Sequence, residues 1–413
     1  MRTHYDAVII GAGPAGSSAA ILLAQAGWSV AVLEKKRFPR RKVCGECVAA
    51  SNLPLLDALG IGPAFDAAAG PPLRQVGLMS GAQNIHADLP PLADGRHPWG
   101  RALGRDVFDS LLLERARQAG ATILQPWAAF AIRGHPGAFQ CDAAALESQA
   151  VSVLTATVLI AAHGSWTPPP DAGSVPRWPR LASDLFAFKA NFKEAEIAHG
   201  LLSVLAFAGA YGGMVMAGGG ITTLACCIRR DRLRSCRELM QGQSAGSAVE
   251  AYMKENCAAV ARALAEARRQ GEWLSAGPIR PGVRVQPRGS GVFLIGNAAG
   301  EAHPIIGEGI SMALQSSWLL CEMLFRYASP VLAGAAQPQI QREYAHAWRG
   351  SFTPRIRWAA LFAHAAMRPA LAPMLLPVLR WKPTLMTCAA RLSGKVRPAP
   401  AHSIITNRPG RSI

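Results

Sequence analysis

The sequence predicts a composite α/β fold, with one domain built on a mainly parallel sheet, a second on an antiparallel sheet, and a helical C-terminal region. Three observations lead to this prediction. Residues 7–10 form an apolar run that enters a glycine-rich turn and then a helix-like stretch, as a strand buried on both faces does. Residues 185–228 contain four segments of alternating hydrophobicity, typical of strands with one buried face. The last part of the chain is apolar and helix-like.

The composition restricts the class of protein. Of 413 residues, 50% are hydrophobic and 17% are charged, so the chain can bury a sizeable core and is neither disordered nor fibrous. Lys and Arg outnumber Asp and Glu by 43 to 26. No zinc-finger or basic-zipper pattern accompanies this charge, so we expect no nucleic-acid partner. The nine cysteines include one isolated Cys-x-x-Cys, which favours a reducing cytoplasm and predicts no metal site.

The N-terminal glycine-rich turn is the first motif that indicates a function. Residues 11–16 read Gly-Ala-Gly-Pro-Ala-Gly between the strand and a helix predicted over 17–26, and a second strand at 29–33 ends in an acid. This is the fingerprint of a dinucleotide site. Gly11 allows the tight turn, Gly13 lets the backbone approach a pyrophosphate, and Gly16 lets helix and strand pack closely. The helix N-terminus attracts the phosphates, and Glu34 can accept hydrogen bonds from ribose hydroxyls.

The following loop distinguishes between the dinucleotides that share this fingerprint. Residues 38–46, Phe-Pro-Arg-Arg-Lys-Val-Cys-Gly-Glu, resemble the loop after the second strand in FAD-dependent oxidoreductases of the geranylgeranyl reductase family. That family shares its fold with hydroxylases of the para-hydroxybenzoate hydroxylase type and with flavin halogenases. The resemblance implies bound FAD. It also implies that Cys44 lies near the flavin as a proton donor or a substrate wall, the alternative being a small buried hydrophobe.

Further segments resemble the same family. Residues 101–108 look like its arginine-led helix, which implies that Arg105 contacts the cofactor; the alternative is a charge at a helix start. Residues 296–300 and 304–311 resemble its second FAD fingerprint, with Asn297 where the family usually has Asp. The 304–309 loop would lie against the flavin ring, with helix-start N–H groups near Ile310 stabilising negative charge there. The predicted cofactor-binding residues are Gly11, Gly13, Pro14, Ala15, Gly16, Glu34, Lys35, Arg41, Cys44, Gly45, Arg105, Gly296, Asn297, Pro304, Gly307, Glu308, Gly309 and Ile310.

Two departures from the family pattern concern the substrate side. His163 stands where the hydroxylases usually have an Asp that touches both FAD and the route of NAD(P)H. Residues 211–216 fall where reductases and halogenases carry an aromatic motif, but the tryptophan of that motif is absent, which disfavours halogenation. Met214 and Met216 in this segment suit either an apolar substrate or an ordinary core.

These motifs predict three regions. Residues 1–74, 101–181 and 280–327 form a discontinuous Rossmann-like FAD-binding domain. Residues 75–100 and 182–279 form the substrate-binding sheet, with added strands at 76–78 and 85–89 and a helix over 248–269. Residues 328–413 form the helical, apolar and basic C-terminal region. Its charge-free run at 369–379 is too short to span a bilayer, so it either lies on a membrane, roofs an apolar cavity or caps the fold.

The sequence therefore predicts an FAD-dependent oxidoreductase, driven by NAD(P)H, in the cytoplasm or at the inner face of a membrane. Its expected substrate is apolar: an isoprenoid, a polyketide or a lipid-like molecule. Reduction of a carbon–carbon double bond is favoured, with Cys44 or water as the proton source. Hydroxylation of an aromatic or phenolic lipid is the close alternative, and a non-catalytic flavin-binding protein is a further one.

Overall fold

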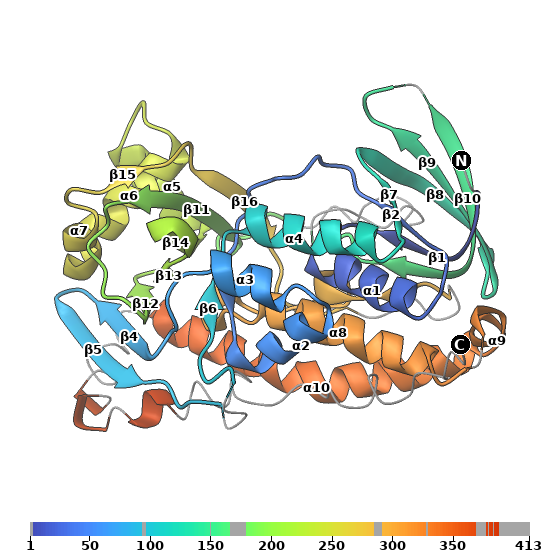
Figure 1. The fold of residues 1–413 in the computed structure, drawn as a ribbon. Coiled ribbons are helices and arrows are strands. Elements are labelled where there is room, and N and C mark those ends of the chain that lie inside the picture. Colours follow the sequence, from blue (N-terminus) through green and yellow to red (C-terminus); the bar gives the residue numbers. More distant parts are fainter. Residues whose placement is uncertain are drawn as a thin grey trace.

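The computed structural model describes residues 3–92, 96–148, 150–165, 179–284, 291–327, 329–368, 377–378, 380–382 and 384–387. The predicted α/β fold is confirmed: two large sheets lie at opposite ends of the molecule, and helices pass between and beneath them (Figure 1). In the described part of the chain, no helix is long and apolar enough to cross a membrane.

The first sheet carries the glycine-rich turn. Its strand order is β7 (Thr122–Leu124), β2 (Val30–Leu33), β1 (His4–Ile10), β10 (Val151–Ala161), β9 (Ala138–Ala145) and β8 (Trp127–His135), with β18 (Phe293–Leu294) beside β10. Strand β1 runs parallel to both β2 and β10, and β18 runs parallel to β10. The carboxyl ends of β1, β10 and β18 therefore meet at one edge, which is where α/β sheets bind ligands.

Helices α1 (Pro14–Gln25), α4 (Arg105–Gln118) and α8 (Gly309–Leu324) pack together beside this sheet (Figure 1). Helix α1 begins at Pro14, three residues before the predicted start, because proline is well tolerated in the first turn. The Ser317 hydroxyl of α8 donates to the Ala15 carbonyl at 2.7 Å. This bond joins the two helices that begin at the two glycine-rich motifs.

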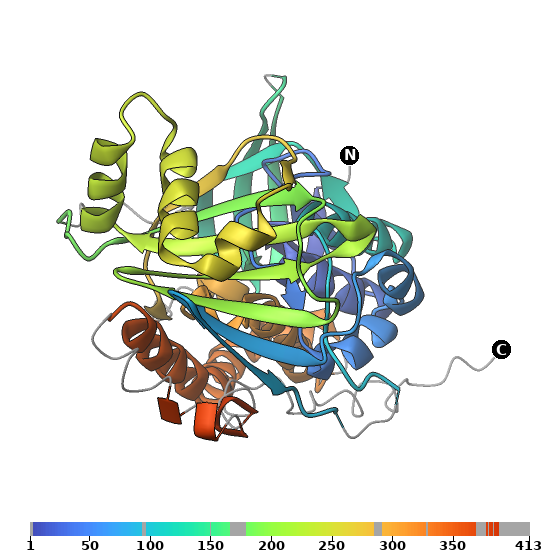
Figure 2. The ribbon, with the colours of Figure 1, turned by 90° about the vertical axis from the view of Figure 1, so that its left-hand side faces the viewer.

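The second sheet is mainly antiparallel. Its order is β15 (Arg268–Arg269), β11 (Leu185–Lys193), β14 (Thr222–Arg229), β13 (Ala210–Met216), β12 (Leu201–Phe207), β4 (Gln75–Ser80) and β5 (Gln83–Asp88), and β16 (Leu274–Ile279) also pairs with β11. Residues such as Phe188 and Leu224 face a core under α5 (Arg230–Leu239), α6 (Ala245–Asn256) and α7 (Ala258–Ala263), which cover the outer face (Figure 2). Alternate residues, including Ala187 and Tyr211, face the first domain.

The prediction of one helix over 248–269 is wrong. Helix α6 ends at Asn256, Cys257 is extended with φ −150°, and α7 then ends at Ala263. The break has a tertiary cause. The Ala258 N–H donates to the Gly81 carbonyl at 2.9 Å, in the turn between β4 and β5, and Cys257 is buried there. Residues 268–269 belong to β15 instead.

The C-terminal region contains α9 (Pro330–Ala335) and α10 (Gln337–Ala366), which runs along the lower side of the molecule in Figure 1. The charge-free run at 369–379 lies outside the described residues except for 377–378. The remaining short elements are α2 (Leu53–Ala58), α3 (Gly62–Ala68), β3 (Cys47–Val48), β6 (Arg101–Ala102), β17 (Gly282–Val283), β19 (Gly300–Glu301) and the 3₁₀ turns η1 (Ala50–Asn52), η2 (Gly218–Gly220), η3 (Gly296–Ala298) and η4 (Pro304–Ile306).

Candidate active site

A large cavity lies between the two sheets. One wall comes from the turns after β1, β10 and β18, and the opposite wall comes from β11 to β14. The predicted residues that line it are Gly13, Pro14, Ala15, Cys44, Gly45, Arg105, Gly296, Asn297, Pro304, Gly307, Gly309 and Ile310. Segments that are almost 300 residues apart in the chain thus contribute to one site.

The three glycines of the first turn have different surroundings. A Cβ at Gly16 would lie 1.9 Å from the Gly11 carbonyl oxygen, and one at Gly11, where φ is +105°, would lie 2.6 Å from that of Ala162. Packing within the protein therefore leaves no room for a side chain at either position. A Cβ at Gly13 would meet only the Arg105 guanidinium, 4.0 Å away, and would point into open space at the cavity wall. Only Gly13 thus leaves room for a ligand.

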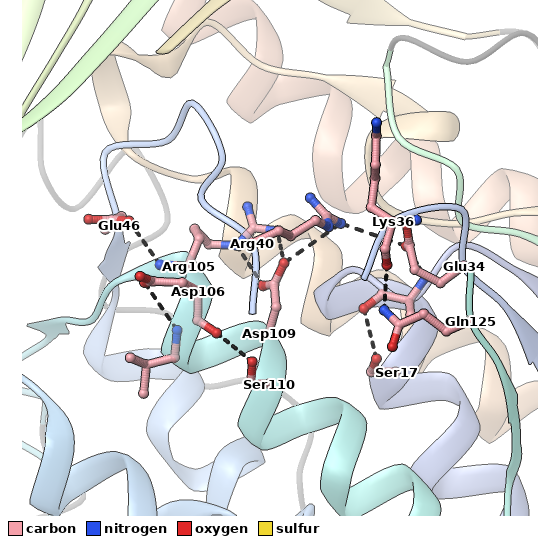
Figure 3. Close-up of polar contacts among 12 residues, drawn as sticks. Ser17, Glu34, Lys36, Arg40, Glu46, Arg105, Asp106, Asp109, Ser110 and Gln125 are labelled. Carbon is pink, nitrogen blue, oxygen red and sulfur yellow. Dashed lines mark hydrogen bonds and ion pairs between the residues drawn. The ribbon is translucent and has the colours of Figure 1, made fainter. Parts of the chain in front are cut away.

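A row of charged side chains lies behind this turn (Figure 3). Arg105 donates two hydrogen bonds to the Asp109 carboxylate, at 2.6 and 2.7 Å. Arg40 lies 3.9 Å from Asp109 and 3.7 Å from Glu34. The Glu34 carboxylate accepts the Ala12 N–H at 3.0 Å, so in this structure it braces the glycine-rich turn from the end of β2 and does not line the cavity.

The loop from Lys42 to Glu46 brings polar groups to the cavity. The Glu46 N–H donates to the Cys44 Sγ at 3.3 Å, which fixes the thiol in the wall. Glu46 has φ +61° and is 1% exposed. Its carboxylate accepts the Arg105 N–H at 2.8 Å and also pairs with the Lys189 ammonium and the Thr223 hydroxyl of the second sheet. This buried contact joins the loop, α4 and the second sheet.

Lys42 gives the site a charge that depends on pH. Burial, together with the Arg105 and Arg40 charges, lowers the pKa of Lys42 to about 8 against the opposing effect of Asp109 and Cys44. A neutral lysine attracts a pyrophosphate less, so affinity for FAD should decrease as the pH rises above about 8. We expect the Kd for FAD to rise by up to about tenfold per pH unit there.

Fluorescence titration of the apoprotein with FAD between pH 7 and 9.5 would measure this dependence. The Lys42→Met variant should bind more weakly at pH 7 and show a flat profile over the same range. Lys36→Met, which changes an exposed lysine of the same loop, should keep the wild-type profile. A sloping profile in Lys42→Met would contradict this assignment.

The second glycine-rich motif closes the cavity from the other side. The Asn297 amide donates to the Ser165 hydroxyl at 3.0 Å and to the Glu301 carboxylate at 3.3 Å. Gly307 takes a left-handed φ of +65°, where a side chain would be strained, and α8 begins at Gly309. The first N–H groups of α8 are thus close to the cavity wall, where they favour negative charge.

Other predicted site residues lie elsewhere. Gly11, Gly16, Glu34, Lys35, Arg41 and Glu308 do not line the cavity. Lys35 is exposed, and the Arg41 guanidinium donates instead to the Gln270 carbonyl at 3.0 Å. Glu308 is buried with Arg355 3.6 Å away. His163 also stays out of the wall, although Ala162 and Gly164 on either side belong to it.

The structure adds residues that the sequence analysis did not select as site residues. Lys42 and Tyr211 line the cavity, Lys189 holds Glu46, and His303 contacts Tyr211. A signal for Lys189 was present, because a lysine at an inward position of the alternating strand 185–192 requires a buried partner. Nothing in the sequence indicated that His303 would contact a strand 92 positions away.

The wall formed by the second sheet carries no charge. Ala187, Val204, Tyr211, Ala225 and Cys227 face the cavity, and their small or apolar side chains leave space beside the first domain. Met214 belongs to the core under the helices and also borders the cavity.

The residues fit FAD. Gly13 leaves room where a pyrophosphate approaches a helix N-terminus, Lys42 and Arg105 supply positive charge, and Gly307 to Ile310 present backbone N–H groups where a ring would lie. Residues 4–350 match the family model described as FAD binding domain. The chain belongs to this family and is an FAD-dependent enzyme.

Comparisons with individual proteins extend this assignment. A menaquinone reductase of Mycolicibacterium smegmatis is 26% identical over 96% of this chain and 93% of its own length. The flavin-dependent brominase Bmp2 shares the fold with a TM-score of 0.73 at 20% identity, and the match covers 95% of this chain and 94% of the brominase. A geranylgeranyl bacteriochlorophyll reductase-like protein of Thermoplasma acidophilum shares it with a TM-score of 0.66 at 17% identity, and that match covers 95% of this chain and 90% of the other. At these identities the structural likeness concerns the fold.

Proposed function

We propose that this enzyme reduces a carbon–carbon double bond of an apolar substrate, with NAD(P)H as the donor that reduces its flavin. The observation that carries the proposal is the uncharged wall opposite the flavin motifs, formed by residues such as Ala187, Val204 and Ala225. A polar or ionised substrate would lose its hydration there without compensation, whereas an isoprenoid or quinone chain would not.

The sequence comparisons also support reduction of an apolar substrate. The menaquinone reductase aligns over nearly the whole chain, and its name denotes reduction of an apolar quinone. A tryptophan 2-halogenase of Chondromyces crocatus aligns over only 29% of this chain. Bound FAD would supply the hydride. The chain would supply an apolar enclosure, positive charge from Lys42 and Arg105, and a proton donor in the wall.

Hydroxylation of an aromatic or phenolic lipid is the second candidate, favoured by the absence from residues 211–216 of the tryptophan that the reductases carry there. The two functions differ in their product. The enzyme would be reduced anaerobically with NADPH or NADH, with dithionite as a control for reducible flavin, and mixed with menaquinone in detergent micelles. Double-bond reduction adds two hydrogen atoms to the isoprenoid side chain without oxygen, and this gain persists after air has reoxidised any quinol to the quinone. A product that forms only in air and contains one more oxygen atom would instead establish the hydroxylase.

We also propose that the C-terminal region contacts an anionic lipid surface from which the substrate would enter. Trp358 and Leu361 on α10 are 39% and 57% exposed, and Trp381 is 78% exposed between the exposed cations Arg380 and Lys382. Exposed aromatic and aliphatic side chains beside cations are typical of surfaces that bind the interface of anionic membranes.

Co-sedimentation with phosphatidylglycerol vesicles would test this contact. The Leu361→Ser/Trp381→Ser double variant should bind at least about tenfold more weakly, since it removes about 1.4 kcal/mol or more of apolar burial. Leu239→Ser is the matched control, because Leu239 is 80% exposed on α5. Equal binding of the double variant and the wild type would exclude the lipid contact.

A further inference from the structure

Three aromatic side chains connect the cavity wall with the molecular surface. Tyr211 on β13 lines the cavity and is 1% exposed. Its hydroxyl lies 3.1 Å from Nδ1 of His303, which directly precedes the Pro304 loop and is 7% exposed. The His303 ring packs edge-on against the His364 ring, with centroids 5.7 Å apart. His364 is exposed on α10, so the row begins in the cavity and ends in solvent.

The hydrogen bonds restrict the protonation of this row. Nδ1 of His364 lies 2.6 Å from the Ala360 carbonyl, and a carbonyl only accepts, so that nitrogen carries a proton. Nε2 of His364 is then the nitrogen that exchanges protons with solvent. Nδ1 of His303 donates in one tautomer and accepts in the other, and the Tyr211 hydroxyl can donate and accept. A proton can therefore pass between Tyr211 and His303 in either direction, and His364 meets the outer side of His303 through a ring contact.

The charges around the row keep its inner part neutral. Burial lowers the pKa of His303 to about 4, and the His364 charge adds to this effect. Burial also raises the pKa of Tyr211 well above its usual value, with further contributions from Cys227, Glu301 and Cys226. The Glu301 carboxylate is itself paired with Arg284 at 3.1 Å. At neutral pH the cavity thus faces a phenol that holds its proton and is backed by a neutral imidazole.

We propose that Tyr211 donates the proton that completes reduction of the double bond, and that His303 and His364 return a proton to it from solvent. This inference rests on the proposed function. The Tyr211 O–H bond breaks as a C–H bond forms at one carbon of the double bond, while the other carbon receives the hydride from the reduced flavin. As Nε2 of His303 takes a proton that enters through His364, Nδ1–H of His303 passes to the phenolate, so no imidazolate forms. Proton exchange of the neutral His303 with solvent then restores its Nδ1–H form. The substrate gains one hydride and one solvent proton, and the flavin is oxidised.

This assignment differs from the expectation that Cys44 or water supplies the proton. Cys44 also lines the cavity, but its Sγ accepts the Glu46 N–H within the loop. Tyr211 has a hydrogen-bonded partner that leads outward to an exposed titratable group, so it can be reprotonated after each turnover without opening the cavity. Tyr211 is the catalytic residue of this proposal, and His303 and His364 act through it.

Single-turnover kinetics on the holoenzyme would test the relay. The flavin is photoreduced without air and mixed with a short-chain polyprenol in micelles, which has double bonds but no quinone ring, and flavin reoxidation is followed by visible absorbance. Tyr211→Phe should slow reoxidation by about 10²- to 10⁴-fold, the usual contribution of a positioned general acid. Cys44→Ser is measured beside it as the competing proton donor, and Lys193→Met, at an exposed lysine outside the cavity wall, should stay within about twofold of the wild type. Probe affinity, measured on the oxidised enzyme, should be unchanged in Tyr211→Phe.

The proposed role of the two histidines in proton return requires a measurement that a purely structural role would not change. Over repeated turnovers, His303→Gln and His364→Ala should slow product formation, show a larger solvent deuterium isotope effect, and be accelerated by added imidazole buffer. Imidazole should leave Tyr211→Phe slow. ¹⁵N-histidine NMR should show a His303 that stays neutral down to about pH 5 and an Nδ1 resonance that shifts in Tyr211→Phe.

The outcomes separate the two proposals. A wild-type enzyme that is never reoxidised by the probe or by other unsaturated lipids overturns the proposed function, and the role of the relay with it. A wild type that turns over while Tyr211→Phe keeps its rate overturns the relay alone, as does a fast Tyr211→Phe beside a slow Cys44→Ser. An unchanged His303 Nδ1 resonance in Tyr211→Phe overturns the hydrogen bond on which the relay depends.

Discussion

Replacement of Lys189 with methionine is expected to lower the free energy of unfolding by about 3–5 kcal/mol. Lys189 and Glu46 are each 1% exposed and form an ion pair across the boundary between the two sheets. Methionine fills most of the space but leaves the Glu46 carboxylate buried without its cation, and an uncompensated buried charge is costly. Urea unfolding followed by circular dichroism, with thermal unfolding as a second measure, would detect the change.

Two variants complete this experiment. Lys193→Met changes an exposed lysine on the same strand and should alter stability by no more than about 0.5 kcal/mol. The double variant Glu46→Gln/Lys189→Met removes both charges and should recover much of the loss, because a buried pair contributes little net stability when both partners are replaced. If Lys189→Met and Lys193→Met unfold alike, the buried pair does not hold the two sheets together.

Replacement of Gly13 with valine is expected to weaken FAD binding by at least about 100-fold, or about 2.7 kcal/mol, and to leave the apoprotein folded. The backbone at Gly13 has φ −68° and ψ −179°, which valine adopts without strain. Its side chain would meet no protein atom closer than 4.0 Å from Cβ and would occupy the space where a pyrophosphate approaches the helix. Calorimetric titration of the apoprotein with FAD would measure the loss.

The Gly16→Val substitution, three residues later, should affect folding as well as FAD binding. A Cβ at Gly16 would lie 1.9 Å from the Gly11 carbonyl oxygen, so Gly16→Val forces the turn and α1 apart. We expect a loss of at least about 1–3 kcal/mol of apoprotein stability in addition to any loss of FAD. A Gly13→Val protein that binds FAD normally would move the pyrophosphate away from this turn and would remove the main support for the site.

Much of this arrangement could be read from local pattern. The apolar run before Gly11, the apolar strand before Gly296 and the alternating strands at 185–228 were predicted to within about three residues at their ends, because a strand's buried faces impose a period that the sequence must show. The glycines at 11, 13 and 16 could be assigned different roles because each role excludes a side chain for its own steric reason. These features depend on neighbours in the chain.

The tertiary structure decided what depends on distant neighbours. The helix predicted over 248–269 breaks at Cys257 because the backbone there pairs with Gly81, a contact that no local propensity encodes. Arg41 lies among the same basic residues as Lys42, yet it turns to the Gln270 carbonyl while Lys42 faces the cavity. The residue types in this loop could not show which of the two cations faces the cavity.

The sequence by itself determined an α/β fold with two glycine-rich motifs and a sheet of alternating hydrophobicity, because backbone sterics and strand periodicity are local constraints. FAD was implied by the resemblance of residues 38–46 and 296–311 to a flavoprotein family. The tertiary structure alone decided which side chains meet across the boundary: Lys189 with Glu46, and Tyr211 with His303. Hydrogen bonds and ion pairs act over a few ångströms in space and leave no period in the sequence, so only the folded chain places these partners together.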